Sequence, residues 1–187
     1  MEVGKALYID KRKDWRLWLE KNYEKEKEVW LIFPNKSTGK KRLDYNDAVE
    51  EALCFGWIDS IVKKYDKDSS AQRFTPRNPG SKYSIPNKMR LIKLVKEGRI
   101  IPSLLSNITD VIKDKYVFPG DIINEIKSNK EAWKNFKKFS RAYREIRIAF
   151  IDGARMRPDE YRKRLNYFIR MTKKNKQFGF GGIEKYF

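Results

Sequence analysis

The stretch Leu43–Asn87 decides the fold of this protein; it reads LDYNDAVEEALCFGWIDSIVKKYDKDSSAQRFTPRNPGSKYSIPN. Its first part predicts a helix, because apolar residues recur at about 100° per residue and Asp44 or Asn46 can cap the N-terminus. Gly56 favours the end of this helix, and Trp57–Lys64 has the alternation that is typical of a strand. A helix followed by short strands predicts an α+β domain.

The flanking sequence predicts further strands and then helices. We expect a helix over 12–23, strands over 28–34 and 71–77, and a fourth strand at Lys5–Tyr8 as an option. Helical patterns follow over 84–97, 102–112, 120–126, 128–139, 143–154 and 158–169. Ser128 and Glu131 form a capping-box pattern, and Gln177–Phe187 is expected to be a mobile or loosely docked tail.

The predicted fold class is therefore α+β, with a small three- to four-stranded sheet, helices packed on it and a helical C-terminal module. We expect residues 1–100 to form the α+β domain that carries the central motif. Residues 101–187 are expected to form the basic, mostly helical module.

The composition excludes several kinds of chemistry. The 187 residues include no histidine and one cysteine. There can be no Ser-His-Asp or Cys-His relay and no histidine-ligated metal, and one cysteine allows neither an internal disulfide nor a cysteine-only zinc site. We therefore expect no cofactor. No apolar run approaches the ~20 residues of a membrane span, so we expect no span and a cytoplasmic location.

The positive charge is concentrated in the last third of the chain. The net charge is +18; residues 1–126 contribute +6, and residues 127–187, with 18 basic and 6 acidic side chains, contribute +12. Such a region suggests an anionic partner, for example nucleic acid. A solvated lysine surface that keeps the protein soluble explains the same charge, and the alternation with aromatic residues at helical spacing favours this second interpretation.

The segment Arg73-Phe74-Thr75-Pro76-Arg77 contains the clearest candidate binding residues. In an extended chain Arg73, Thr75 and Arg77 share one face, and two guanidiniums about 7 Å apart can hold a phosphate or carboxylate. The alternative is that both arginines pair with acids of the neighbouring strand and only fasten the hairpin. The sequence does not decide between the two.

Four further residues complete the predicted binding site. Ser84 caps the next helix, whose N-terminal N–H groups favour an anion, and Tyr83 and Trp57 offer flat walls for a planar ligand. Asp59 is expected on the same side as Trp57, where an arginine of the adjacent strand is its obvious partner. A structural Asp–Arg pair is commoner than an acid/base device.

Two other residues have environments that the pattern describes. Cys54 is expected on the polar side of its helix with Glu50 and Glu51, near the negative end of the helix dipole, which disfavours an activated thiolate. Arg147 lies on the apolar side of its helix and needs an acid, a carbonyl or a ligand unless it extends outward. With the other arginines of 141–164 it predicts a guanidinium-rich surface on the last two helices.

Several of these motifs together resemble a known family, the YdeI/OmpD-associated or bacteriocin-protection proteins. The resemblance is carried by Trp15, Trp18-Leu19, Val29-Trp30-Leu31, Tyr45, the run Ala48–Ser60, Arg73–Arg77, Ser84, Tyr143-Arg144 to Ala154-Arg155, Arg157-Pro158 and Arg164-Leu165. It extends over nearly the whole chain, departing at Tyr83, where the family usually has tryptophan, and over 100–118. The resemblance implies a small soluble protein, and it implies no reaction and no catalytic residues.

Three functions are compatible with this sequence. The leading one is a binding module for an anionic, phosphate- or carboxylate-bearing small ligand. The second is non-specific nucleic-acid binding through the basic C-terminal helices. The third is an enzyme that uses Asp59 as a base with Arg73 and Arg77 polarising the substrate.

Overall fold

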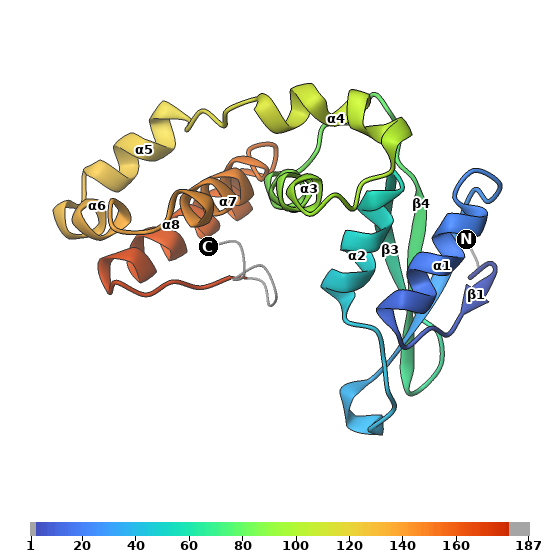
Figure 1. The fold of residues 1–187 in the computed structure, drawn as a ribbon. Helices are drawn as coiled ribbons and strands as arrows, with labels where there is room; N and C mark the ends of the chain where they lie inside the picture. Colours follow the sequence, from blue (N-terminus) through green and yellow to red (C-terminus); the bar gives the residue numbers. More distant parts are fainter. Residues whose placement is uncertain (1–2, 180–187) are drawn as a thin grey trace. The chain divides into compact units, whose positions relative to one another are not determined.

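The computed structural model describes residues 3–179, which form four strands, a 3₁₀ helix and eight α-helices (Figure 1). The strands are β1 (Ala6–Leu7), β2 (Val29–Pro34), β3 (Trp57–Lys64) and β4 (Ser69–Pro76), and the 3₁₀ helix η1 is Lys36–Thr38. The α-helices are α1 (Arg12–Asn22), α2 (Tyr45–Cys54), α3 (Ile85–Lys96), α4 (Pro102–Lys113), α5 (Gly120–Lys127), α6 (Lys130–Phe136), α7 (Arg141–Asp152) and α8 (Pro158–Lys173). The α+β class is confirmed.

The sheet has the order β1-β2-β4-β3 and is mixed. β1 pairs with β2 in parallel, whereas β2 with β4 and β3 with β4 are antiparallel. The predicted fourth strand is present as two residues, and β3 has the predicted bounds. β4 begins two residues before the predicted start, at Ser69.

The strand register decides which side chains face the helices. Asp59 is the partner of Phe74 across β3 and β4, so both point to the same face of the sheet. The helix α1 covers this face: the Trp15 ring lies 5.5 Å from Phe74, and the Trp18 ring lies 5.9 Å from Trp57. Arg73, next to Phe74 in sequence, therefore points to the opposite face.

The chain divides into two compact units, and each has its own core. The first comprises the residues up to Lys82 together with Arg90–Ile112, and the second comprises Tyr83–Met89 and the residues from Lys113 onward. Trp15, Trp30 and Phe74 are fully buried in the first unit. The core of the second consists of Ile122, Ile126, Ala132, Phe136, Phe139, Tyr143, Ile148, Ile151, Leu165 and Phe168.

The predicted capping box at Ser128 and Glu131 is wrong. α5 continues to Lys127, and the Ser128 hydroxyl donates back to the carbonyl of Glu125. Asn129 caps α6 instead, because its side-chain oxygen accepts a hydrogen bond from the Ala132 N–H at 3.0 Å. Ser128 is the C-cap of α5, and α6 follows so closely that the next residue, Asn129, is its N-cap.

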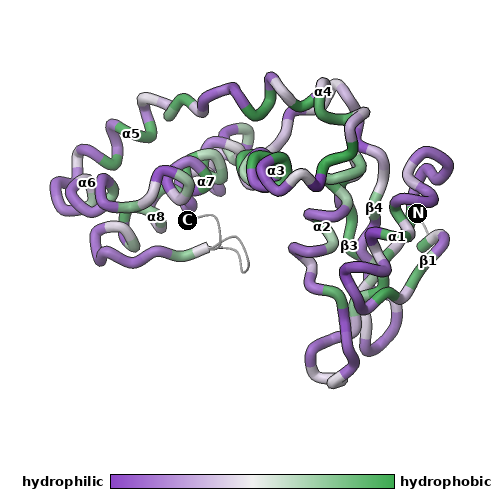
Figure 2. Tube along the Cα trace, in the orientation of Figure 1, coloured by the Kyte–Doolittle hydropathy of each residue, from purple (hydrophilic) through white to green (hydrophobic). Residues whose placement is uncertain are grey.

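Hydrophilic and hydrophobic residues alternate along the helices of both units (Figure 2). Among residues 3–179 no helix combines the length and the apolar character that crossing a membrane requires. The helices α1, α2 and α5 to α8 each contain buried residues beside exposed ones.

Candidate functional site

The structure places Arg73 and Thr75 on one face of β4, as predicted. However, Arg73 and Arg77 both already have protein partners. Arg73 Nε donates to Glu28 Oε2 at 2.8 Å, and its Nη2 donates to the same oxygen. This pairing with the Arg73 guanidinium holds the pKa of Glu28 below its usual value. Arg77 donates to the carbonyls of Asn78, at 3.3 Å, and Ser81. Anion binding by this segment stays a prediction.

Asp59 does not join these arginines. Because it faces the same side of the sheet as Phe74, it lies on the face opposite Arg73, and its carboxylate accepts a hydrogen bond of 2.5 Å from the Tyr45 hydroxyl. The predicted Asp59–arginine pair is therefore wrong, and the geometry assembles no site from Asp59, Arg73 and Arg77.

The aromatic and capping residues of the predicted site also have other environments. Trp57 is 1% exposed and donates its ring N–H to the Tyr23 carbonyl, so it is a core residue and not a ligand wall. Tyr83 and Ser84 belong to the second unit. The Ser84 hydroxyl accepts from the Asn87 N–H at 3.4 Å and so caps the start of α3, as predicted.

The predicted polar side of α2, which carries Glu50, Glu51 and Cys54, is buried. All three residues are fully buried. Burial first, and then the negative charge of Glu51, raise the pKa of the Cys54 thiol to about 11. The expectation of an inactive thiol therefore agrees with this environment, although the reason is burial and not only the helix end.

Arginines from two other segments satisfy these buried carboxylates. Arg12 donates to Glu51 at 2.5 Å, to Glu50 at 2.9 Å and to Asp47. Burial alone would lower the pKa of Arg12, but the hydrogen bonds to Glu51 and Glu50 outweigh it and raise that pKa. Arg16 donates to the second oxygen of Glu51 at 3.0 Å. We call this group of acidic and arginine side chains the carboxylate cluster.

Gly98 turns the chain after α3 and so brings a further arginine, Arg99, into the carboxylate cluster. Gly98 has a φ of +65°, and the Gly98 and Arg99 N–H groups donate to the Val95 and Leu94 carbonyls, both at 3.0 Å. This reversal of the chain brings Arg99 onto Glu51. Lys93 lies 3.4 Å from Glu50.

The carboxylate cluster is a fastening of α1, α2 and the end of α3, because its acids are occupied by internal cations. Within residues 3–179 no group of three or more acidic, cysteine or histidine side chains is arranged to hold a metal ion. Glu50 and Glu51 are thus occupied by cations of the same unit.

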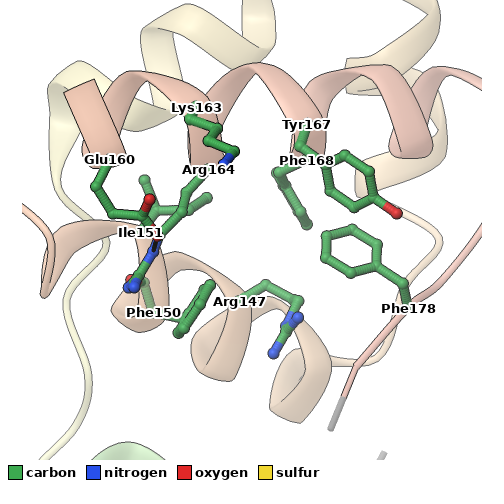
Figure 3. A pocket seen from close by; sticks show the side chains of 9 residues that line it. All are labelled: Arg147, Phe150, Ile151, Glu160, Lys163, Arg164, Tyr167, Phe168 and Phe178. Atoms are coloured by element: carbon green, nitrogen blue, oxygen red, sulfur yellow. Dashed lines mark hydrogen bonds and ion pairs between the residues drawn. The ribbon is translucent and has the colours of Figure 1, made fainter.

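The second unit contains a pocket of about 200 Å³ between α7 and α8 (Figure 3). It is lined by Arg147, Phe150 and Ile151 of α7, by Glu160, Lys163, Arg164, Tyr167 and Phe168 of α8, and by Phe178. Figure 3 shows the α8 side chains projecting from one side, Phe150 and Arg147 from the other, and Phe178 approaching Tyr167. We call it the aromatic pocket.

Helical spacing explains how α8 lines the aromatic pocket. Glu160, Lys163, Arg164 and Tyr167 follow one another at i, i+3, i+4 and i+7, which places them in one stripe. Arg164 is fixed in this stripe: it donates to Glu160 at 2.7 Å and to the Phe150 carbonyl at 2.8 Å. That carbonyl lies in the last turn of α7, where helices leave acceptors available. Arg164 thus joins the two helices.

A turn after α8 brings Phe178 to the aromatic pocket. Asn175 has a φ of +53°, and the Asn175 and Lys176 N–H groups donate to the carbonyls of Thr172 and Met171 at 2.9 and 3.0 Å. The Phe178 N–H then donates to the Tyr143 hydroxyl at 3.1 Å, and its ring lies 4.8 Å from Tyr167, nearly perpendicular to it. The predicted tail is thus docked at Phe178; residues 180–187 lie outside the described residues.

Arg147 forms the cationic floor of the aromatic pocket. It is 3% exposed, and its guanidinium lies 5.0 Å from the Phe178 ring and 5.3 Å from the Phe150 ring. Its position on the apolar side of α7 is confirmed. The Arg164 guanidinium lies 3.7 Å from the centre of the same Phe150 ring.

Part of this pocket was accessible from the sequence. The sequence pattern identifies Arg147, because an arginine at an apolar helix position is unusual. It does not identify Lys163, Tyr167 or Phe178 as site residues. The available signal was the i, i+3, i+4, i+7 stripe on α8, in which aromatic and charged residues share one side. Phe178 carried no such signal, because it lies beyond the helix.

These features define an α+β protein with a helical second unit that contains an aromatic, cation-lined pocket. Residues 7–107 match the family described as a domain of unknown function, DUF8412. This match covers more than half of the chain, and the protein therefore belongs to that family.

Residues 115–175 match a second family, described as "Bacteriocin-protection, YdeI or OmpD-Associated". The resemblance to that family is confirmed, over the part of the chain that holds α5 to α8 and most of the aromatic pocket. The central motif, Leu43–Asn87, falls instead within the range of the first family. No curated protein and no solved structure matches the chain.

Proposed function

We propose that the protein binds a small anionic ligand that carries a single ring, in the aromatic pocket of the second unit. The supporting observation is that one cavity combines aromatic walls with an excess of cations. Arg147, Lys163 and Arg164 line it against one acid, Glu160. The ligand class is the one expected from the sequence, but its position is different.

The size of the aromatic pocket supports a one-ring ligand. Its volume is about 200 Å³. A protein cavity of roughly 150 Å³ holds benzene, whereas drug-sized ligands occupy about 300–1,000 Å³. A ring with one carboxylate or phosphate group is the corresponding size.

The charges support an anionic group on that ring. Arg164 uses two of its N–H groups for Glu160 and the Phe150 carbonyl, and that salt bridge offsets one positive charge. Arg147 and Lys163 leave the lining with a net positive charge. A cation beside apolar walls attracts an anion more strongly than it does in water, because the local dielectric constant is lower.

The aromatic walls support the ring. Phe150, Tyr167, Phe168 and Phe178 come from three segments of the chain, and edge-to-face contact between Tyr167 and Phe178 fixes two of them. Such rings offer flat surfaces on which a planar ligand can stack at 4.5–7 Å between ring centres, as aromatic pairs in proteins do, typically with about 0.5–1.5 kcal/mol per pair.

Isothermal titration calorimetry with benzoate and phenyl phosphate tests this proposal, with benzyl alcohol and inorganic phosphate as probes that lack the charge or the ring. We expect the two aromatic anions to bind and each partial probe to bind at least about tenfold more weakly. Equal binding of benzyl alcohol, or no binding of either aromatic anion, would overturn the proposal.

Substitutions test the location of the site. Arg147→Met keeps most of the side-chain volume and removes the charge, and we expect at least about tenfold weaker binding. Arg144→Met, on the same helix but outside the pocket lining, is the matched control. Because Arg147 is buried, Lys163→Met, with Lys173→Met as its control, provides a second test on exposed residues. Equal losses in variant and control would place binding elsewhere.

A further inference from the structure

A second feature of the second unit is a set of exposed lysines around α6 and the end of α8, which we call the lysine surface. It consists of Lys127, Lys130, Lys134, Lys137, Lys138, Lys173, Lys174 and Lys176. None of these residues lines the aromatic pocket. This surface is therefore independent of the proposed ligand site.

The two groups of lysines belong to one surface because α6 is joined to the end of α8. The buried Asn135 of α6 donates its side-chain N–H groups to the carbonyls of Thr172, at 3.1 Å, and Lys173, at 3.2 Å. Both stretches are hydrophilic in Figure 2. Segments that are some forty residues apart in sequence thus present their lysines together.

The lysine surface has almost no acids to balance it. Residues 127–138 and 170–176 contain nine cationic side chains, the eight lysines and Arg170, and one acid, Glu131. No ion pair within residues 3–179 involves any of the eight lysines. Arginines nearby do pair with acids, as in Arg155–Asp121 and Arg141–Glu145. Arg141, Arg155, Arg162 and Arg164 of this unit thus pair with acids. The eight lysines of the lysine surface are instead exposed to solvent, where like charges repel one another.

Trp133 lies within the lysine surface. The Lys127 and Lys137 ammonium groups lie 5.3 and 5.8 Å from its ring, which is partly exposed. The ring also stacks on Phe136 at 5.6 Å, which fixes its orientation. An aromatic ring beside cations is the combination with which proteins bind single-stranded nucleic acids, through base stacking and phosphate contacts.

The absence of exposed apolar side chains distinguishes this surface from a membrane-binding one. Within residues 127–138 and 170–176 no large hydrophobic side chain is exposed. Interfacial membrane binding needs such side chains to enter the lipid, in addition to basic charge.

We propose that the lysine surface binds the phosphate backbone of a single-stranded nucleic acid and that Trp133 stacks on one of its bases. The lysines act as flexible point charges for successive phosphates, which gives affinity without sequence preference. Trp133 distinguishes an unpaired strand from a duplex, because bases in a duplex are already stacked on each other.

Fluorescence anisotropy of the full chain with labelled 20-nucleotide oligothymidylate and oligouridylate tests the lysines. We expect log Kd to depend linearly on log salt concentration with a slope of about 0.7 per neutralised phosphate, and so about 3 for four contacts. Replacing Lys130, Lys134, Lys137 and Lys138 with glutamine should remove most of this slope and weaken binding at least about thirtyfold at 50 mM salt. The matched control replaces Lys36, Lys40, Lys41 and Lys67, which are exposed lysines of the first unit, and changes the net charge equally.

Trp133→Leu tests stacking. We expect about tenfold weaker binding of the single strand with an unchanged salt slope, and restored binding in Trp133→Phe. Circular dichroism verifies that each variant folds. No binding at low salt, equal losses in the two lysine variants, equal binding of a duplex with no effect of Trp133→Leu, or binding to phosphatidylserine vesicles alone would each overturn the proposal.

Discussion

Two groups of arginines, one in each unit, have different surroundings. In the carboxylate cluster of the first unit, Arg12, Arg16 and Arg99 all reach Glu51, a buried acid. In the aromatic pocket of the second unit, Arg147 and Arg164 lie on phenylalanine rings beside a cavity. The comparison teaches that arginines enclosed by carboxylates fasten helices to one another, whereas arginines that lie on aromatic rings beside a cavity can also contact a ligand.

Burial decides the energetic meaning of each arrangement. Removing water from Glu50 and Glu51 costs several kcal/mol per ion, and only multiple hydrogen bonds to the guanidiniums repay it. Within the carboxylate cluster, Glu50 and Glu51 are thus held by their arginine partners. In the aromatic pocket the cations line a cavity of about 200 Å³, and this space is what a ligand can fill.

The largest expected effect is that of breaking the carboxylate cluster. Glu51→Ala leaves Arg12, Arg16 and Arg99 facing one another without their shared acid, and we expect a loss of about 3–5 kcal/mol in the free energy of unfolding. Urea denaturation followed by far-UV circular dichroism measures it, because both units contain helices. Glu160→Ala, the corresponding change beside the aromatic pocket, should have little effect. Equal losses would contradict the distinction between the two arrangements.

The Cys54 thiol provides a second test of the same contrast. With a pKa of about 11, Cys54 is roughly one part in a thousand thiolate at pH 8, about a hundredfold less than a thiol with a pKa of 9.0. Iodoacetamide should therefore label the folded protein very slowly and react readily in urea. Mass spectrometry follows the labelling, and Glu51→Ala should accelerate it. Rapid labelling of the folded wild type would show that this side of α2 opens to solvent.

A smaller effect is expected at the two chain reversals that position Arg99 and Phe178. Gly98→Ala should cost about 1–2 kcal/mol through the positive φ alone, because no atom lies within 4 Å of the added methyl group. Asn175→Gly should be tolerated, because asparagine already occupies the left-handed region with some strain. Thermal melting compares the two. A Gly98→Ala protein as stable as the wild type would exclude a constraint at this turn.

The smallest effect concerns an exposed pair. The Arg155 guanidinium holds the pKa of Asp121 well below its ordinary value. Because the folded pKa is depressed, this pair stabilises the protein above the unfolded pKa of about 3.9 and loses its contribution as the pH falls toward the folded value. Asp121→Asn should lower the melting temperature slightly at pH 7 and less at pH 2, and added salt should reduce the difference, since half of the side chain is exposed. An equal decrease at both pH values would point to a cause other than charge.

Local patterns in the sequence predict much of the fold. The helical and alternating periodicities identify every strand and α-helix within residues 3–179, most of them to within two residues. Gly56 and Pro158 mark helix ends correctly, because a positive φ and a missing N–H are properties of the residue itself. The capping residue of α6 is missed, since Ser128 and Asn129 both suit the position and only the length of α5 decides between them.

The candidate site is harder to predict from the sequence than the fold. Arg147 is identifiable because a charged residue at an apolar helix position is conspicuous, and the Arg73–Thr75 alternation follows from strand geometry. The partner of Arg73 cannot be identified from the sequence, because Glu28 lies 45 residues away and reaches Arg73 only through the pairing of β2 with β4. Asp59 is misplaced for the same reason: only the register with Phe74 shows which face it occupies.

By itself the sequence determined the α+β class, the order of the helices and strands, the lack of histidine chemistry and the excess of positive charge near the C-terminus. These depend on residue type and on spacing within a few turns. Only the tertiary structure decided that Glu50 and Glu51 are buried and satisfied, that Phe178 returns to α8, and that the lysines of α6 and α8 share a surface. Which charge meets which is a matter of packing between distant segments, and local periodicity carries no information about that.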